Sequence, residues 1–101
     1  MIAVEKVFSV LTARVLLEVV ADLLERIDAF GDSPEVEAGV KAALNEIIYQ
    51  VGLNGGEIGD VSAILIDAGI DVANPLVAAV LADWQNGTIN ATNYMTISDK
   101  R

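Results

Sequence analysis

Two residue types that carry much of the metal and nucleophile chemistry of proteins are missing from this chain of 101 residues. It contains no cysteine and no histidine. A disulfide framework is therefore excluded, as are zinc and iron sites of the usual type, which need thiolate or imidazole ligands. A serine or threonine nucleophile lacks its usual base, because the three lysines, at positions 6, 41 and 100, adjoin no serine motif. We expect a protein that is not an enzyme and that has no cofactor.

Basic residues are also scarce. Six Lys and Arg stand against 15 Asp and Glu, which gives a net charge of −9, and the isoelectric point is about 4.1. Binding to a nucleic-acid backbone or to anionic lipid needs clusters of basic side chains, so we expect no direct nucleic-acid binding. An acidic surface is instead typical of a protein with basic partners or bound cations, or simply of a highly soluble one.

Long apolar runs are absent as well. The longest strongly apolar stretch without a charge covers residues 72–82, far short of the roughly 20 residues that span a bilayer. Glu5 and Lys6 interrupt the apolar start of the chain, which is not typical of a signal peptide. We therefore expect no membrane span, and a protein that is cytoplasmic or belongs to a virion assembled in the cytoplasm.

Hydrophobic residues, by contrast, are abundant, at 53% of the chain. A chain of this length forms one domain with one core, and so small a domain buries only part of its surface. The composition excludes disorder over most of the chain. We expect a single helical domain over residues 1–101, with residues 96–101 as a loose tail and with apolar surface left over for other subunits.

Helical periodicity predicts an all-α fold, with a long antiparallel helical hairpin followed by two or three short helices. The first helix is predicted to end at Gly31 and the second to begin at Ser33-Pro34, where serine caps the helix and proline suits its first position. The second helix is predicted to stop at Gly52. Three shorter helices are predicted from Asp60 to about Ala68, from Asn74-Pro75 to about Gln85, and from Asn90 through Tyr94 to Ile97.

The apolar pattern of the first helix changes direction near Thr12. After it, one stripe at helical spacing is predicted to face the core: Val15, Leu16, Val19, Val20, Leu23, Leu24, Ile27 and Phe30. Before it, another set falls on the face that Glu18 and Asp22 occupy later: Val4, Val7, Phe8 and Leu11. Either residues 2–11 form a separate element, such as a short strand, or one helix carries two apolar faces with different partners. The second alternative predicts an interface at these four residues.

The helix predicted to begin at Pro75 is apolar nearly all round, since only Asp83 and Gln85 are polar before its exit. A helix of this kind is buried on several sides. It is therefore either the central helix of the core or a helix in a subunit interface. For the second case, Trp84 joins the predicted interface residues.

Charge is unevenly distributed along the sequence. From Ala42 to Asp99 there is no Lys or Arg, although acidic residues recur throughout this span. Asp60 and Asp67 share a helix face, and Asp71 joins them if the helix persists past Gly69. This predicted acidic contact face has three interpretations: a solvated surface, a contact with basic residues of another chain, or a site for loosely held divalent cations.

Two local patterns resemble ligand loops but fail in detail. The glycine-rich residues 52–59 lack the Lys followed by Ser or Thr of a phosphate-binding loop, and Glu57 would repel an anion. Residues 82–93 place Ala82 and Asn93 where a calcium loop needs an Asp and a bidentate carboxylate. The sequence therefore predicts turns between helices at both places.

These observations favour assembly over catalysis. The leading hypothesis is a small structural protein that recurs as a subunit of a larger particle, such as a phage or virus capsid, connector or tail, through self-association or docking on another protein. The alternative is an acidic inhibitor or adaptor that occupies a basic groove on a partner protein. The salt dependence of binding distinguishes the two hypotheses. Electrostatic docking weakens steeply between low and moderate salt, whereas assembly through apolar contacts barely responds.

Overall fold

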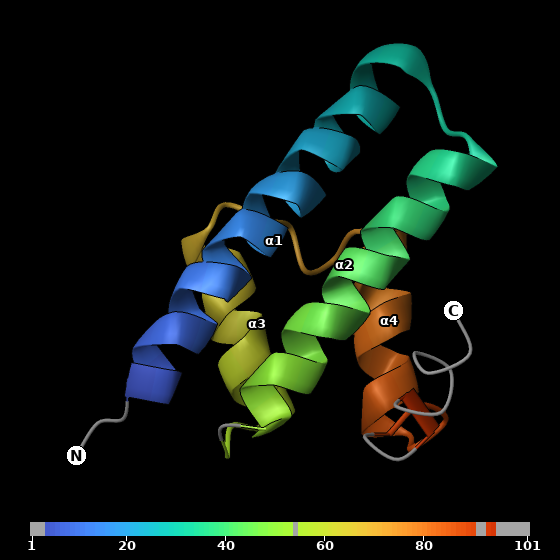
Figure 1. Cartoon of the computed structure of the whole chain (residues 1–101). Coiled ribbons are helices and arrows are strands. Elements are labelled where there is room, and N and C mark those ends of the chain that lie inside the picture. Colours follow the sequence, from blue (N-terminus) through green and yellow to red (C-terminus); the bar gives the residue numbers. More distant parts are fainter. Residues whose placement is uncertain (1–3, 54, 91–92, 95–101) are drawn as a thin grey trace.

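The structure, a computed structural model, describes residues 4–53, 55–90 and 93–94, and for residues 4–13 it describes the backbone only. Over this part of the chain the fold is entirely helical, without a strand (Figure 1). Its four helices are α1 (Val4–Phe30), α2 (Pro34–Leu53), α3 (Ile58–Asp67) and α4 (Pro75–Gln85). The predicted all-α class is confirmed.

The helices α2 and α4 begin in the same way, at a polar residue followed by proline. Ser33 Oγ accepts a hydrogen bond of 3.2 Å from the Val36 amide. Asn74 Oδ1 likewise accepts one of 2.9 Å from the Leu76 amide. Each cap satisfies an amide that has no partner within its helix, and the proline that follows has no amide to satisfy. The predicted starts of these two helices are confirmed.

The helices α1 and α2 end at glycines in the left-handed conformation. Gly31, with φ of 89°, directly follows α1, as predicted. The second helix runs one residue past its predicted stop at Gly52, and the left-handed residue is Gly55, with φ of 82°. There the Gly56 amide donates a hydrogen bond of 2.9 Å to the Val51 carbonyl. This pairing closes the helix end, and glycine adopts the required conformation without the strain that a side chain would impose.

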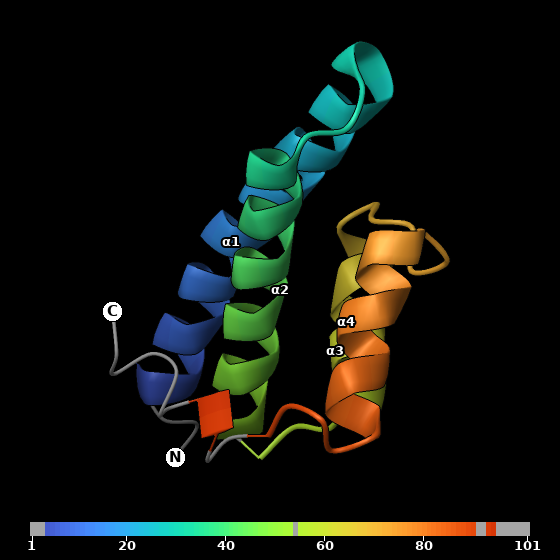
Figure 2. The same cartoon turned by 90° about the vertical axis from the view of Figure 1, so that its right-hand side faces the viewer.

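The four helices form two layers. α1 and α2 make one layer, and α3 and α4 make the other (Figure 2). α2 contacts each of the other helices, whereas α1 packs mainly on α2. The central helix of the fold is therefore α2. The helix α4 belongs to the layer that it forms with α3, and its residues Ala78 and Ala79 are exposed.

The core lies between α2 and its three neighbours. α2 contributes more of it than any other helix, with five buried side chains, whereas α1 contributes two among its described side chains, Leu17 and Val20. The largest fully buried side chains are Leu44, Ile47, Leu65, Val20, Val40, Val61 and Val77. No buried polar or charged residue occurs among the described side chains, so apolar burial stabilises this core.

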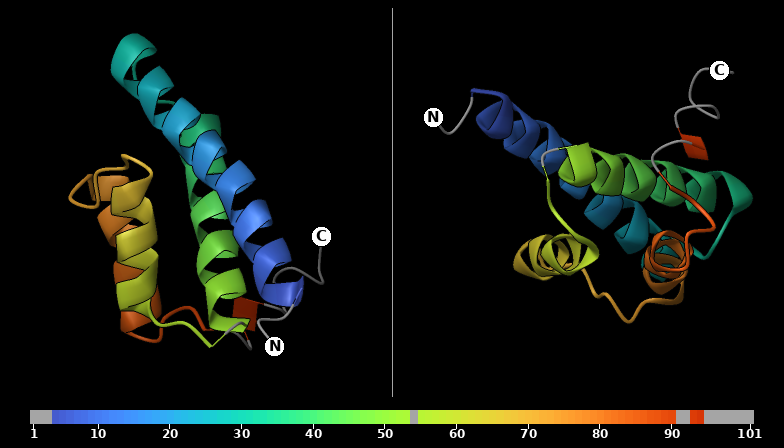
Figure 3. Two further views of the ribbon diagram at one scale, coloured as in Figure 1. Left: turned by 90° about the vertical axis from the view of Figure 1, so that its left-hand side faces the viewer. Right: turned by 90° about the horizontal axis from the view of Figure 1, so that it is seen from below.

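The apolar stripe predicted for α1 is divided between two sides of the helix. Val20 faces the core, as does Leu17, which the predicted stripe did not include. Val15 is 61% exposed, Val19 is 41% exposed and Phe30, at the end of the helix, is 87% exposed. The prediction that these three residues face the core is wrong. α1 lies at the edge of its layer (Figure 3), where α2 covers one side of it and leaves the far side in solvent.

Two further expectations concern the ends of the chain. The backbone of residues 4–11 is helical and continuous with the rest of α1, so the strand alternative is wrong there. Of the last predicted helix, the structure describes Asn93 and Tyr94, which are helical, and Asn90 Oδ1 accepts a hydrogen bond of 3.0 Å from the Asn93 amide. Ile97 and the predicted tail, residues 96–101, lie outside the described residues. None of the described helices is long and apolar enough to cross a membrane.

Candidate interaction surface

Exposed apolar side chains of α1 lie on the side that is turned away from the core. Val15 and Val19 are one helical turn apart there, and Arg14 and Glu18 are exposed along one edge of the pair. We call these four residues the outer face of α1. The face combines apolar surface with one charge of each sign, which is a composition suited to a protein–protein contact.

A groove adjoins the outer face on the side of α3. Its volume is about 540 Å³, and its lining residues are Arg14, Leu17, Glu18, Ala21, Ile64, Asp67 and Ala68. The lining is apolar except for the charged side chains Arg14, Glu18 and Asp67. Since Arg14 and Glu18 belong to both the groove and the outer face, the two features form one continuous surface.

The predicted N-terminal interface residues Val4, Val7, Phe8 and Leu11 lie on helical backbone, and their side chains are outside the described part of the structure. Helical periodicity assigns three of these positions, Val4, Phe8 and Leu11, to the face of α1 that Val15 and Val19 continue. The structure therefore connects the predicted interface to two valines that sequence reasoning had assigned to the core.

Trp84, the remaining predicted interface residue, makes contacts inside the domain. Its side chain is half-buried, and the indole Nε1 donates a hydrogen bond of 2.9 Å to Asn45 Oδ1. Its ring centroid lies 5.8 Å from that of Tyr94. Trp84 thus connects α4 to α2, and a role for it in an intermolecular interface stays a prediction.

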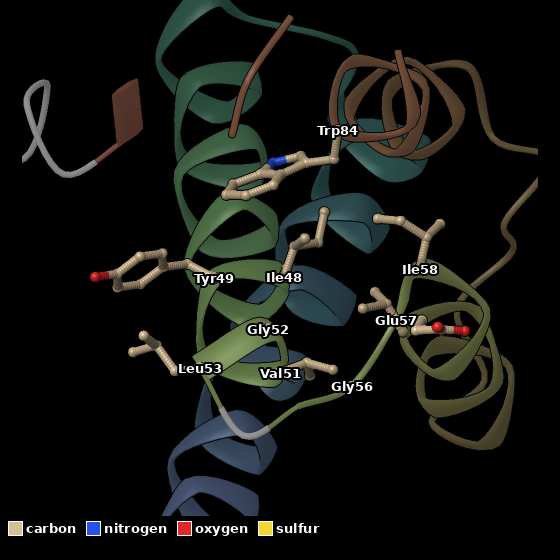
Figure 4. Close-up of a pocket in the computed structure, with 10 residues that line it drawn as sticks. Ile48, Tyr49, Val51, Gly52, Leu53, Gly56, Glu57, Ile58 and Trp84 are labelled. Atoms are coloured by element: carbon tan, nitrogen blue, oxygen red, sulfur yellow. The ribbon is translucent and has the colours of Figure 1, made fainter. Parts of the chain in front are cut away.

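A small pocket of about 270 Å³ lies beneath Trp84, between α2 and α3. Ile48 and Ile58 point into the space below the indole ring, whereas Tyr49 and Leu53 point away from it (Figure 4). Glu57 is the one charged residue of its lining. The pocket is smaller than most ligand sites, which measure roughly 300–1,000 Å³ and carry several convergent polar groups. Its size and lining do not favour a ligand site.

A polar and aromatic cluster attaches the segment after α4 to α2. The Tyr94 hydroxyl donates a hydrogen bond to Glu46 Oε2, and Gln50 Nε2 donates one of 3.5 Å to Glu46 Oε1. The rings of Tyr49 and Tyr94 lie 5.0 Å apart. Sequence reasoning missed this cluster because Glu46 and Tyr94 are 48 residues apart in the chain. These contacts hold the two segments together.

The three residues of the predicted acidic contact face have separate roles. Asp60 Oδ2 accepts a hydrogen bond of 2.8 Å from the Glu57 amide at the start of α3, and Asp71 Oδ1 accepts one of 2.9 Å from the Ala73 amide. Asp67 lines the groove beside α1. Because α3 ends at Asp67, Asp71 does not continue its face. The described residues contain no group of three or more side chains placed to hold a metal ion.

Comparison of the chain with protein families, with curated proteins and with solved structures gives no match. Any functional conclusion must therefore come from the geometry of the molecule.

Proposed function

We propose that the protein is a non-catalytic assembly subunit that associates with further copies of itself through α1. The observation that carries this proposal is the exposure of Val15 and Val19 beside an apolar groove. Single exposed apolar residues are ordinary on a protein surface. Here Arg14 and Glu18 connect them to a groove whose lining includes the apolar residues Leu17, Ala21 and Ile64, and exposed apolar side chains next to a groove are typical of an interaction site.

We also propose that α1 and α2 form a long antiparallel hairpin, an arrangement that suits this role. α2 is held by neighbours in both layers, and α1 is held along one side by α2. The outer face therefore belongs to a helix that is already ordered before a partner binds. An ordered surface loses little conformational entropy on association, which favours binding.

The polar side chains near the core support a structural function over a catalytic one. Trp84 bonds to Asn45, and Tyr94 bonds to Glu46, so each pair is engaged in holding helices together. A particle built from many copies, such as the capsid, connector or tail of a phage or virus, is the setting that we propose for such a subunit.

The mass of the protein in solution tests the proposal. Light scattering after gel filtration at micromolar concentration should give a multiple of the 10.7 kDa chain mass. That mass should change little between low and moderate salt, because apolar contacts dominate. A stable monomer with cooperative unfolding at this concentration would contradict the proposal. A monomer that binds a basic protein with steep salt dependence would instead support an acidic adaptor.

A double substitution locates the contact. Val15→Glu with Val19→Glu places two charges on the outer face, and glutamate is a good helix former, so the chain should fold but lose its partner. The matched control is Ile66→Glu, because Ile66 is 59% exposed and lines neither the groove nor the outer face. Far-UV circular dichroism should show helix in both variants, and the mass should fall in the first variant only.

A further inference from the structure

We propose that Asn86 is a site of spontaneous deamidation, in which the backbone nitrogen of Gly87 attacks the side-chain amide of Asn86. The products are aspartate and isoaspartate, and both place a new negative charge where α4 ends. This inference goes beyond the proposed function and does not depend on self-association. Three observations support it: the identity of the next residue, the absence of side-chain hydrogen bonds at Asn86 within the described part of the chain, and the exposed turn that holds both residues.

The reaction needs water as its only co-reactant. The Gly87 nitrogen forms a bond with Asn86 Cγ, the Cγ–Nδ2 bond breaks, and ammonia leaves with the proton from the Gly87 nitrogen. Water then adds at either carbonyl carbon of the five-membered succinimide ring, which opens to aspartate or isoaspartate. Because the nucleophile and its target are neighbours in one chain, the attack is intramolecular and loses no translational entropy in bringing them together.

The residue after Asn86 favours the attack because it is glycine. A side chain at that position would shield the backbone nitrogen, and Gly87 has none. Gly87 lies in the left-handed region, with φ of 77°, and no described atom beyond its chain neighbours lies within 4 Å of the position that a Cβ would occupy. The surroundings of the Gly87 backbone are therefore open, and glycine gives this peptide unit the freedom to rotate.

Asn86 differs from the other described asparagines in its hydrogen bonds. Asn45 Oδ1 and Asn74 Oδ1 each accept a hydrogen bond. The side chains of Asn90 and Asn93 each accept one from the other's backbone amide. The Asn86 side chain is exposed and makes none with any described residue. Its amide group therefore reorients without the loss of a hydrogen bond to the protein, which the other four would incur.

The turn must open before the two atoms meet. Asn86 has ψ of −8°, which places the Gly87 nitrogen beside the Asn86 amide and not beside Cγ. Rotation about the Cα–C bond of Asn86 breaks the hydrogen bond of 3.4 Å from the Gly87 amide to the Trp84 carbonyl, a distance longer than usual for such bonds. The Ile89 amide bonds to the Asp83 carbonyl at 3.0 Å, so the turn is partly restrained and the reaction proceeds from transient openings.

The new charge falls where a helix tolerates it least. The carbonyl end of a helix carries partial negative charge, and Asp83 already lies in the last turn of α4, three residues before Asn86. Like charges at this spacing are destabilising. Isoaspartate also adds one carbon to the main chain between α4 and Tyr94, whose hydroxyl bonds to Glu46. Deamidation should therefore weaken the end of α4 and the segment that follows it.

Peptide mapping of the full chain, after incubation at neutral pH and body temperature, tests the site. Cleavage before aspartate releases residues 83–98 as one fragment with Asn86 and Asn93, whereas the other Asn–Gly pair, Asn54-Gly55, falls in residues 32–59. Asn86 should deamidate at least about tenfold faster than Asn93, whose side chain must first break its hydrogen bonds and whose next residue shields the nitrogen. Isoaspartate should form beside aspartate at Asn86, because the ring is its source.

Two variants at the same position provide the controls. Asn86→Gln keeps an amide group, but attack on it would have to close a larger ring, so the fast reaction in residues 83–98 should disappear. Asn86→Asp carries the charge of the product from the start. Its midpoint of urea denaturation, followed by the fluorescence of Trp84, should be lower than that of Asn86→Gln. Far-UV circular dichroism checks that both variants fold.

Three results would overturn the inference. Equal rates at Asn86 and Asn93, or aspartate as the sole product at Asn86, would show that the Gly87 nitrogen does not attack. A fast reaction that persists in residues 83–98 of the Asn86→Gln protein would place the site elsewhere. Equal denaturation midpoints of the two variants would show that the new charge does not weaken the end of α4. Fast deamidation with isoaspartate at Asn86, abolished by Asn86→Gln, would establish the site.

Discussion

The helices α1 and α2 are both long and both rich in apolar residues, yet they differ in how much of that apolar surface is buried. α2 buries five side chains between Val40 and Ile48. α1 buries two over residues 14–30, the part in which its side chains are described. The difference follows from the number of neighbours, since α2 contacts three helices and α1 packs mainly on one. A helical repeat thus predicts a helix, but the surrounding helices decide which of its apolar residues leave water.

The largest expected effect is at the centre of α2. Leu44 is fully buried, and Leu44→Ala should lower the free energy of unfolding by about 2–5 kcal/mol, through lost burial and an added cavity. The matched change on α1 is Val15→Ala, which should alter it by less than about 0.5 kcal/mol at a dilution where the protein is monomeric. Urea denaturation measures both. Equal losses would show that the outer face is buried within a single copy and would remove the contrast between the helices.

An intermediate effect is expected where α2 holds α4. Asn45→Ala removes the acceptor for the Trp84 indole N–H, which should cost about 1 kcal/mol of unfolding free energy. Trp84 is the single tryptophan of the chain, so its fluorescence should change as well. Lys41→Ala is a control on the same helix, because Lys41 is exposed. Identical stability and emission in both variants would show that α4 is held by apolar packing alone.

The smallest effect concerns the exposed start of α2. A hydrogen bond with the Asp32 side chain, and then the negative charge of Asp32, raise the pKa of Glu37 above its ordinary value of 4.5. A carboxyl group with a raised pKa binds its proton more tightly in the folded state. Its contribution to stability is therefore complete below the ordinary pKa and is lost as the pH rises through the raised one.

Substitution of Asp32 tests this interaction in the segment between α1 and α2. Asp32→Asn removes the neighbouring charge and should lower the pKa of Glu37, as followed by an NMR titration of its side chain. The unmodified protein, titrated under the same conditions, is the control. A Glu37 titration that does not move in the Asp32→Asn protein would show that the two carboxyl groups do not interact.

The sequence by itself determined the helical class and where most helices begin and end. α2 begins at the predicted Pro34 and α4 at the predicted Pro75, and Gly31 ends α1. These signals act within one turn of the chain, because a cap, a proline or a left-handed glycine satisfies or removes backbone groups only a few residues away. Even the shift from Gly52 to Gly55 at the end of α2 stays within that range.

Only the tertiary structure decided which face of each helix is covered. Periodicity placed Val15 and Val19 in the core, but both are exposed. Arg14 and Glu18 line a surface groove, and no pattern in the sequence indicated this. The hydrogen-bond partner of the Trp84 indole is Asn45, which lies 39 residues away in the chain. Burial depends on how many helices surround a given side, which is a property of the assembled fold, and a repeat of 3.6 residues contains no information about how many neighbours a helix will have.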